Sequence, residues 1–92
     1  MKGFIIKQMD WDEAKKLGIH EWEEWESGPS ITDGEFPVQE SCYFLEGELH
    51  LTVGEEIHLV KPHMFVTFPK GLPCKWDIPH YLKKLYKNDF EL

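Results

Sequence analysis

The sequence is poor in positive charge and in cysteine, and it contains no long apolar run. Ten Lys/Arg residues stand against seventeen Asp/Glu, a formal net charge of −7. A nucleic-acid-binding protein needs a basic surface for phosphates, so that class of partner is excluded. No stretch is apolar and long enough to cross a bilayer, and residues 1–13 lack a signal-peptide core. The sequence thus predicts a cytoplasmic protein without membrane contact.

The two cysteines, Cys42 and Cys74, are too few for a disulfide framework and fit a reducing compartment. The sequence is nevertheless rich in core-forming residues, since 41% of it is hydrophobic and 14% is aromatic. A disordered chain would be poorer in both. A length of 92 residues allows one modest core. We therefore predict a single domain over residues 1–92.

Short strands separated by turn residues dominate the chain from residue 35 onward. Before them, Asp10 can cap a short helix that runs through residues 12–17, with Gly18 as its C-terminal stop. The stretch Cys42–Leu45 is apolar on both faces, which is typical of a strand buried between two layers. Many short strands at spacings of about 8–12 residues favour a sandwich or barrel. The predicted fold class is all-β, with one short N-terminal helix.

Hydrophobic alternation gives the first expected hairpin a register. A three-residue loop over residues 54–56 would pair Val53 with Ile57 and Leu51 with Leu59. A two-residue loop would instead set polar residues against apolar ones. The pattern therefore predicts the three-residue loop, with all four apolar side chains on the buried face.

Two further segments have predicted orientations. The stretch Leu82–Tyr86 is expected to be an amphipathic strand with its lysines outside. Trp22 and Trp25 lie three residues apart among glutamates. They are expected to pack on the outside of the core rather than form a ligand cage, because tryptophan mostly serves burial.

Two motifs resemble those of the cupins, small jelly-roll β-barrels. Residues 40–48, ESCYFLEGE, are similar to the first cupin motif, in which a metal-binding Glu precedes a turn glycine by seven positions. Residues 66–76, VTFPKGLPCKW, are similar to the second motif, built on Pro-x-Gly. The motif-bearing region is about 34–86. The chain is identified as a small single-domain cupin, similar to ureidoglycine aminohydrolase and the ethanolamine-utilisation cupins.

The resemblance also implies where metal ligands would lie. A metal-binding cupin presents His-x-His, then Glu, then a second-motif His. Glu40 matches the carboxylate, and Cys74 holds the last His position. The upstream pair falls at residues 34 and 36, or at 33 and 35, and none of these is histidine. We therefore expect no bound cofactor of the usual kind. If manganese, iron or zinc binds, Glu40 and Cys74 are the ligands expected.

The same resemblance predicts a pocket inside the barrel. If Glu40 points inward, the period of two along a strand brings Cys42 and Phe44 inward as well. The same argument from Cys74 adds Trp76. The predicted pocket residues are Phe36, Glu40, Cys42, Phe44, Cys74 and Trp76.

Three interpretations of this pocket stay open. The cysteines can be buried structural residues. The pocket can bind a small organic molecule, with Trp76 stacking and Glu40 accepting hydrogen bonds. It can also be catalytic, with Glu40 as general acid or base and Cys74 as nucleophile or metal ligand.

The leading function is a small-molecule-binding or catalytic pocket that lacks the usual histidine ligands. One alternative is a non-catalytic accessory or regulatory module that acts through partner contacts. The other is an enzyme similar to a ureido or amide hydrolase, with a Glu/Cys metal site. Whether the protein is an enzyme stays open. A homodimer is expected, because jelly-roll edges and exposed aromatic residues favour pairing.

Overall fold

The computed structural model describes residues 3–92 as two antiparallel sheets with one short helix, α1 (Trp11–Lys16), and a 3-10 turn, η1 (Ile19–Glu21). In chain order the strands are β1 (Ile5–Gln8), β2 (Glu23–Ser27), β3 (Ser30–Gly34), β4 (Glu40–Gly47), β5 (Leu49–Val53), β6 (Glu56–Val60), β7 (Met64–Phe68), β8 (Cys74–Ile78) and β9 (Leu82–Asn88).

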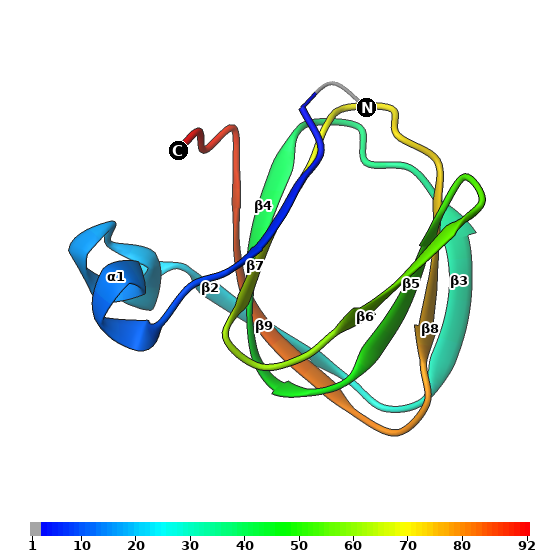
Figure 1. The fold of residues 1–92 in the computed structure, drawn as a ribbon, viewed down its shortest axis with the longest axis horizontal. Coiled ribbons are helices and arrows are strands. Elements are labelled where there is room, and N and C mark those ends of the chain that lie inside the picture. The colour runs from blue at the N-terminus through cyan, green and yellow to red at the C-terminus, as the bar shows by residue number, and fades with distance from the viewer. Residues whose placement is uncertain (1–2) are drawn as a thin grey trace.

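The strands form two layers that face each other (Figure 1). The five-stranded sheet has the order β1-β7-β4-β9-β2, and the four-stranded sheet has the order β3-β8-β5-β6. The main hydrophobic core fills the space between them, with Phe44, Leu51 and Phe68 among its buried side chains. The predicted all-β jelly-roll architecture with a short N-terminal helix is confirmed.

A second, smaller core lies outside the five-stranded sheet, beneath α1. Asp10 caps the helix by accepting a hydrogen bond from the Glu13 backbone N–H at 2.8 Å, and Gly18 follows its last turn in a left-handed conformation. Ala14 and Ile19 pack here against Tyr43 of β4. The predicted cap, Asp10, and the predicted stop, Gly18, are confirmed, and the helix itself ends at Lys16.

Strand β4 therefore has buried side chains on both faces, as its apolar run predicted. Cys42 and Phe44 face the main core, whereas Tyr43 between them faces the helix. The Tyr43 hydroxyl donates a hydrogen bond to the Met9 carbonyl oxygen at 2.9 Å, which ties the segment before α1 to the barrel. This central strand carries the first predicted site residue, Glu40, at its start.

The predicted register of the β5–β6 hairpin is wrong. Thr52 pairs with Ile57, and only two residues separate the strands, with Gly54 at φ +61°. Ile57 and Leu59 consequently face outward and are 74% and 45% exposed. Because β6 is an edge strand, its inward positions do not have to be uniformly apolar, and alternation alone could not identify its buried face.

Gly47, the turn glycine of the first motif, lies at the end of β4 in close contact with another segment. Its φ is +89°, and a Cβ built on it would lie 1.9 Å from the Tyr81 carbonyl oxygen. A residue with a side chain would therefore be strained both by its backbone and by overlap. This contact fixes the end of β4 against the residue that precedes β9.

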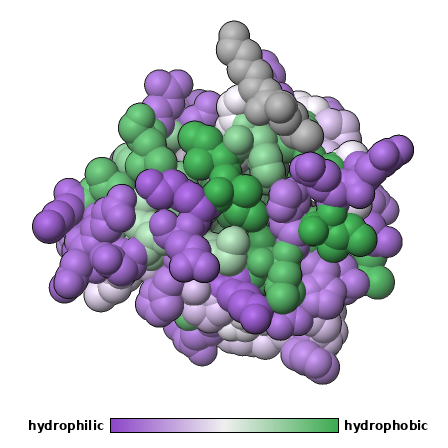
Figure 2. Space-filling view, viewed as in Figure 1, coloured by the Kyte–Doolittle hydropathy of each residue, from purple (hydrophilic) through white to green (hydrophobic). Residues whose placement is uncertain are grey.

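Most of the margin of the surface in Figure 2 is hydrophilic, and apolar side chains gather mainly in the middle of this face. Within residues 3–92, no helix is long and apolar enough to span a membrane.

Candidate functional site

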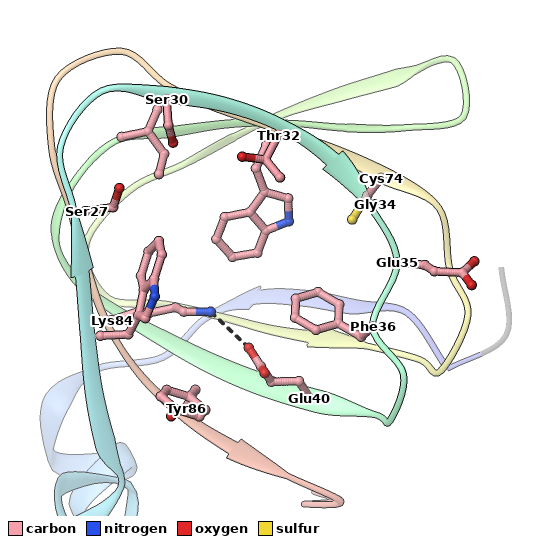
Figure 3. Close-up of a pocket in the computed structure, with 13 residues that line it drawn as sticks. Ser27, Ser30, Thr32, Gly34, Glu35, Phe36, Glu40, Cys74, Lys84 and Tyr86 are labelled. Atoms are coloured by element: carbon pink, nitrogen blue, oxygen red, sulfur yellow. Dashed lines mark hydrogen bonds and ion pairs between the residues drawn. The ribbon is translucent and has the colours of Figure 1, made fainter.

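A half-open cavity of about 650 Å³ lies within the barrel. Its polar residues come from different strands. Ser30 and Thr32 of β3 lie across the cavity from Glu40 of β4 and Lys84 of β9 (Figure 3). A volume of this size is typical of small-molecule sites.

Lys84 faces the cavity, although the sequence predicted its side chain outside. Its Nζ donates a hydrogen bond to Glu40 Oε2 at 2.9 Å, and the two side chains are only 7% and 12% exposed. Along β9 the residues that face inward are Leu82, Lys84 and Tyr86, whereas Leu85 packs under the helix. Because apolar residues occupy both faces of this strand, its pattern does not reveal which face the lysine takes.

Cys42 completes a buried triad with this ion pair. Its thiol donates a hydrogen bond to Glu40 Oε2 at 3.3 Å and accepts one from Lys84 Nζ at 3.4 Å. The carboxylate therefore satisfies two buried donors through a single oxygen atom. A buried ammonium needs such partners, since an unpaired charge in the interior is strongly unfavourable.

Four aromatic rings surround the Lys84 ammonium. The distances from Nζ to the ring centroids are 4.6 Å for Trp76, 5.0 Å for Trp25, 5.5 Å for Tyr86 and 5.9 Å for Phe36. Each ring lies within the range of a cation–π interaction, which strengthens where water is excluded. Lys84 is therefore held by one carboxylate, one sulfur and an aromatic cage.

Electrostatics keeps this lysine charged and both cysteines protonated at neutral pH. Burial disfavours the ammonium of Lys84, but Cys42 and Glu40 outweigh burial and raise its pKa. Burial raises the pKa of the Cys42 thiol to about 12 and also raises the pKa of Cys74. A nucleophilic cysteine needs the opposite shift. The two thiols therefore lack the activation that nucleophilic catalysis requires.

The structure brings four of the predicted pocket residues to the cavity wall: Phe36, Glu40, Cys74 and Trp76. Cys42 and Phe44 point inward as expected, but they belong to the main core and do not line the cavity. Cys42 contributes through its hydrogen bonds to Glu40 and Lys84. No disulfide joins the two cysteines, and both are free.

The donor set does not fit a cupin-type metal centre. Among residues 3–92, no group of three or more His, Cys, Asp or Glu side chains is placed to hold a metal ion. The Glu40 carboxylate already binds an ammonium, and a divalent cation at the same oxygen would face electrostatic repulsion from Lys84. Both thiols would also have to lose a proton against a raised pKa.

Sequence reasoning missed Lys84, Trp25 and Tyr86 as cavity residues. Trp22 packs beside the second core as expected, with its ring centroid 4.8 Å from that of Phe90, but Trp25 lines the cavity. Period two along β2 would have linked Trp25 with Ser27 on one face, had the strand been recognised there. The acidic background of this segment favoured a surface interpretation instead.

The glutamates of that background bind β9. The Tyr86 hydroxyl donates to Glu23 at 2.8 Å, and Lys83 Nζ lies 3.0 Å from Glu24. Strand β2 is the edge of its sheet and pairs with β9 over its whole length. These contacts hold Trp25 in the cavity wall.

Two antiparallel sheets around an interior cavity define a jelly-roll barrel of the cupin class. Residues 14–86 match the model of the EutQ-like cupin domain. A DUF861 family protein from Thermotoga maritima gives a TM-score of 0.84 at 30% identity, over 92% of this chain and 98% of its own. No curated protein matches the chain.

Two larger proteins share the fold. A candidate ethanolamine utilization protein Q (EutQ) from Salmonella typhimurium gives a TM-score of 0.64 at 23% identity, over 71% of this chain and 53% of its own. EutQ from Clostridium difficile gives 0.65 at 18% identity, over 73% of this chain and 56% of its own. The chain thus matches about half the length of either. It belongs to the EutQ-like cupin domain family, as the two motifs predicted.

Proposed function

We propose that this cupin binds a small organic molecule in the cavity that Lys84 and Glu40 share. The observation that carries the proposal is a cavity of about 650 Å³ that combines aromatic walls with a buried ion pair. Apolar rings supply contact area, and a few fixed polar groups supply orientation, which is the usual composition of a ligand site. The proposal is one of binding, because neither thiol is activated for catalysis.

Two alternatives have less support. An enzyme similar to a ureido or amide hydrolase with a Glu40/Cys74 metal centre would need the Glu40–Lys84 pair to separate and a thiol to ionise. Metal analysis of protein purified without chelator tests this alternative, and stoichiometric manganese, iron or zinc would support it. A regulatory module that acts only through partner contacts would not need a cavity, and recovery of one stoichiometric partner with an empty cavity would favour it.

We also infer a cytoplasmic homodimer. Strand β6 is an open sheet edge on which Ile57 and Leu59 are exposed. Light scattering measures the assembly, and a monomer mass at micromolar concentration would contradict the dimer.

Binding can be tested with three named probes: indole, phenol and 2-pyridone. In ¹H–¹⁵N spectra of the labelled protein, the indole N–H signals of Trp25 and Trp76 should shift with probe concentration. The signals of Trp11 and Trp22 should not, because these side chains pack by the helix rather than in the cavity. Shifts confined to Trp11 and Trp22, or no shifts at all, would contradict the proposal.

A matched pair of variants provides the control. Thr32 lines the cavity and pairs with Trp76, so Thr32→Trp should fill the cavity and abolish the shifts. Thr52→Trp makes the same change on the outer face of the four-stranded sheet, where Thr52 pairs with exposed Ile57. This variant should bind the probes as the native protein does. Equal binding by both variants would place the probes outside the cavity.

A further inference from the structure

If the proposed binding function holds, the charges inside the cavity determine whether it favours anionic, cationic or neutral ligands. Lys84 and Glu40 form one ammonium and one carboxylate in direct contact, and their formal charges cancel. An anionic ligand near Lys84 would also lie near Glu40, and a cationic ligand near Glu40 would also lie near Lys84. The sequence contains no arginine that could bind an anion at the mouth. The balanced pair therefore favours a neutral ligand.

Glu35 does not change this balance. Its side chain lies at the edge of the cavity and points away from the Lys84–Glu40 pair (Figure 3). The residue is exposed, so water screens its charge.

The ion pair leaves one donor and one acceptor side by side. Both hydrogen bonds to Glu40 end on Oε2, so within residues 3–92 Oε1 has no protein donor. An ammonium has three N–H donors, and the described acceptors, Glu40 and Cys42, use two of them. A ligand that meets this pair can therefore donate to Glu40 and accept from Lys84 at the same time.

The walls favour a flat ligand. Phe36 and Trp76 lie with ring centroids 6.2 Å apart, and Trp25 lies 6.3 Å from Trp76 at an interplanar angle of 84°. Rings set at such angles provide both faces and edges for a planar guest. A flexible aliphatic chain would lose more rotamer entropy on binding for the same contact area.

We propose that the cavity selects a neutral, planar heterocycle with a lactam edge. In a ring lactam the carbonyl oxygen and the N–H occupy adjacent atoms, which matches the adjacent donor and acceptor of the ion pair. The carbonyl oxygen accepts a hydrogen bond from Lys84 Nζ, and the ring N–H donates one to Glu40 Oε1. The proposal depends on the small-molecule-binding function and specifies the chemical class of its ligand.

The test compares three ring compounds of similar size: 2-pyridone, 1-methyl-2-pyridone and nicotinate. Titrations follow the indole N–H signals of Trp25 and Trp76. The methylated compound keeps the ring and the carbonyl oxygen but cannot donate, so we expect it to bind about tenfold more weakly than 2-pyridone. Nicotinate carries a negative charge and should bind no more tightly than 1-methyl-2-pyridone.

Substitution of Glu40 tests the assigned partner. In Glu40→Gln the amide oxygen should turn to the Lys84 ammonium and leave the NH₂ group facing the cavity. The approximately tenfold preference for 2-pyridone should then disappear. Glu35→Gln is the matched control and should retain the preference. If Glu40→Gln fails to fold, the double variant Glu40→Leu/Lys84→Met removes both charges and should bind both pyridones equally.

The two proposals fail in different ways. Equal binding of 2-pyridone and its methylated form to the native cavity would overturn the lactam inference and leave the binding function standing. Tighter binding of nicotinate would overturn the preference for a neutral ligand. If neither these three compounds nor indole nor phenol shifts the indole N–H signals of Trp25 and Trp76, the proposed binding function itself is wrong.

Discussion

Lys84 Nζ and Glu40 Oε2 lie 2.9 Å apart inside the barrel, on adjacent strands of one sheet. Neither charge can be removed alone without leaving the other buried and unpaired. Stability should therefore depend on the two residues jointly.

We expect Lys84→Met to lower the free energy of unfolding by about 3–5 kcal/mol, since it isolates the Glu40 carboxylate. The double variant Glu40→Leu/Lys84→Met should recover most of this loss. Lys83→Met, on the outer face of the same strand, should cost far less, because water screens the ion pairs of Lys83 with Glu24 and Glu46. Urea unfolding measures all three. A loss in Lys84→Met no larger than that in Lys83→Met would contradict the buried pair.

The close contact at Gly47 makes a second prediction. Gly47→Ala should destabilise the protein by about 3 kcal/mol, through left-handed backbone strain and overlap with the Tyr81 carbonyl. Gly71→Ala is the control, because Gly71 also has a positive φ but open space around it. It should cost only about 1 kcal/mol. Thermal unfolding distinguishes the two, and equal costs would rule out the steric term.

Buried Cys42 predicts a loss of stability at alkaline pH. Its pKa is raised from 9.0 to about 12, so the unfolded state loses the proton at a lower pH than the folded state. Stability from this group is complete below about pH 9 and is lost as the pH rises toward about 12, by up to about 4 kcal/mol.

Urea unfolding at a series of pH values measures this slope. Lys84 also has a raised pKa and contributes with the same sign, so the slope should shrink in Cys42→Ala without vanishing. An unchanged slope in Cys42→Ala would contradict the assignment to Cys42.

Thiol labelling provides the fourth prediction. Cys42 is fully buried in the core, whereas Cys74 is 8% exposed and lines the cavity. At neutral pH, iodoacetamide should modify Cys74 first and Cys42 only after unfolding, and both slowly because both thiols are protonated. Mass spectrometry of the digested protein locates the label. Faster reaction at Cys42 would contradict the burial of its thiol in the main core.

The sequence predicted the layers of this fold better than the contents of its cavity. Cys42–Leu45 identified a strand covered on both sides, and the two motifs at residues 40–48 and 66–76 together identified the family. Strand β9 is also covered on both sides, and for this reason the sequence did not reveal that Lys84 points inward. Leu82 and Leu85 are both buried, although they lie on opposite faces of β9: Leu82 packs in the main core, and Leu85 packs in the second core beneath the helix. In a strand with apolar residues on both faces, the hydrophobic pattern does not show which alternate residues point into the barrel.

The residues of the cavity wall likewise fall into those that the sequence predicted and those that it missed. Phe36, Glu40, Cys74 and Trp76 lie within the motif-bearing region, about residues 34–86, for which the family resemblance predicts the inward positions. Trp25 lies outside this region, on an edge strand whose outward glutamates contact Lys83 of β9 and Tyr81, the residue before β9. The Trp25 side chain points inward because β2 pairs with β9, about 60 positions away in the sequence. The local sequence pattern around Trp25 contains no information about this pairing.

The cation of this barrel is part of the polypeptide. A metal ion dissociates on dilution, is removed by chelators and differs between growth media, whereas the Lys84 ammonium is present in every copy from the moment of folding. Ligand binding at this site should therefore be indifferent to metal supply and to EDTA. It should instead be vulnerable to reagents that modify amines, such as cyanate, whenever the barrel opens far enough to admit them.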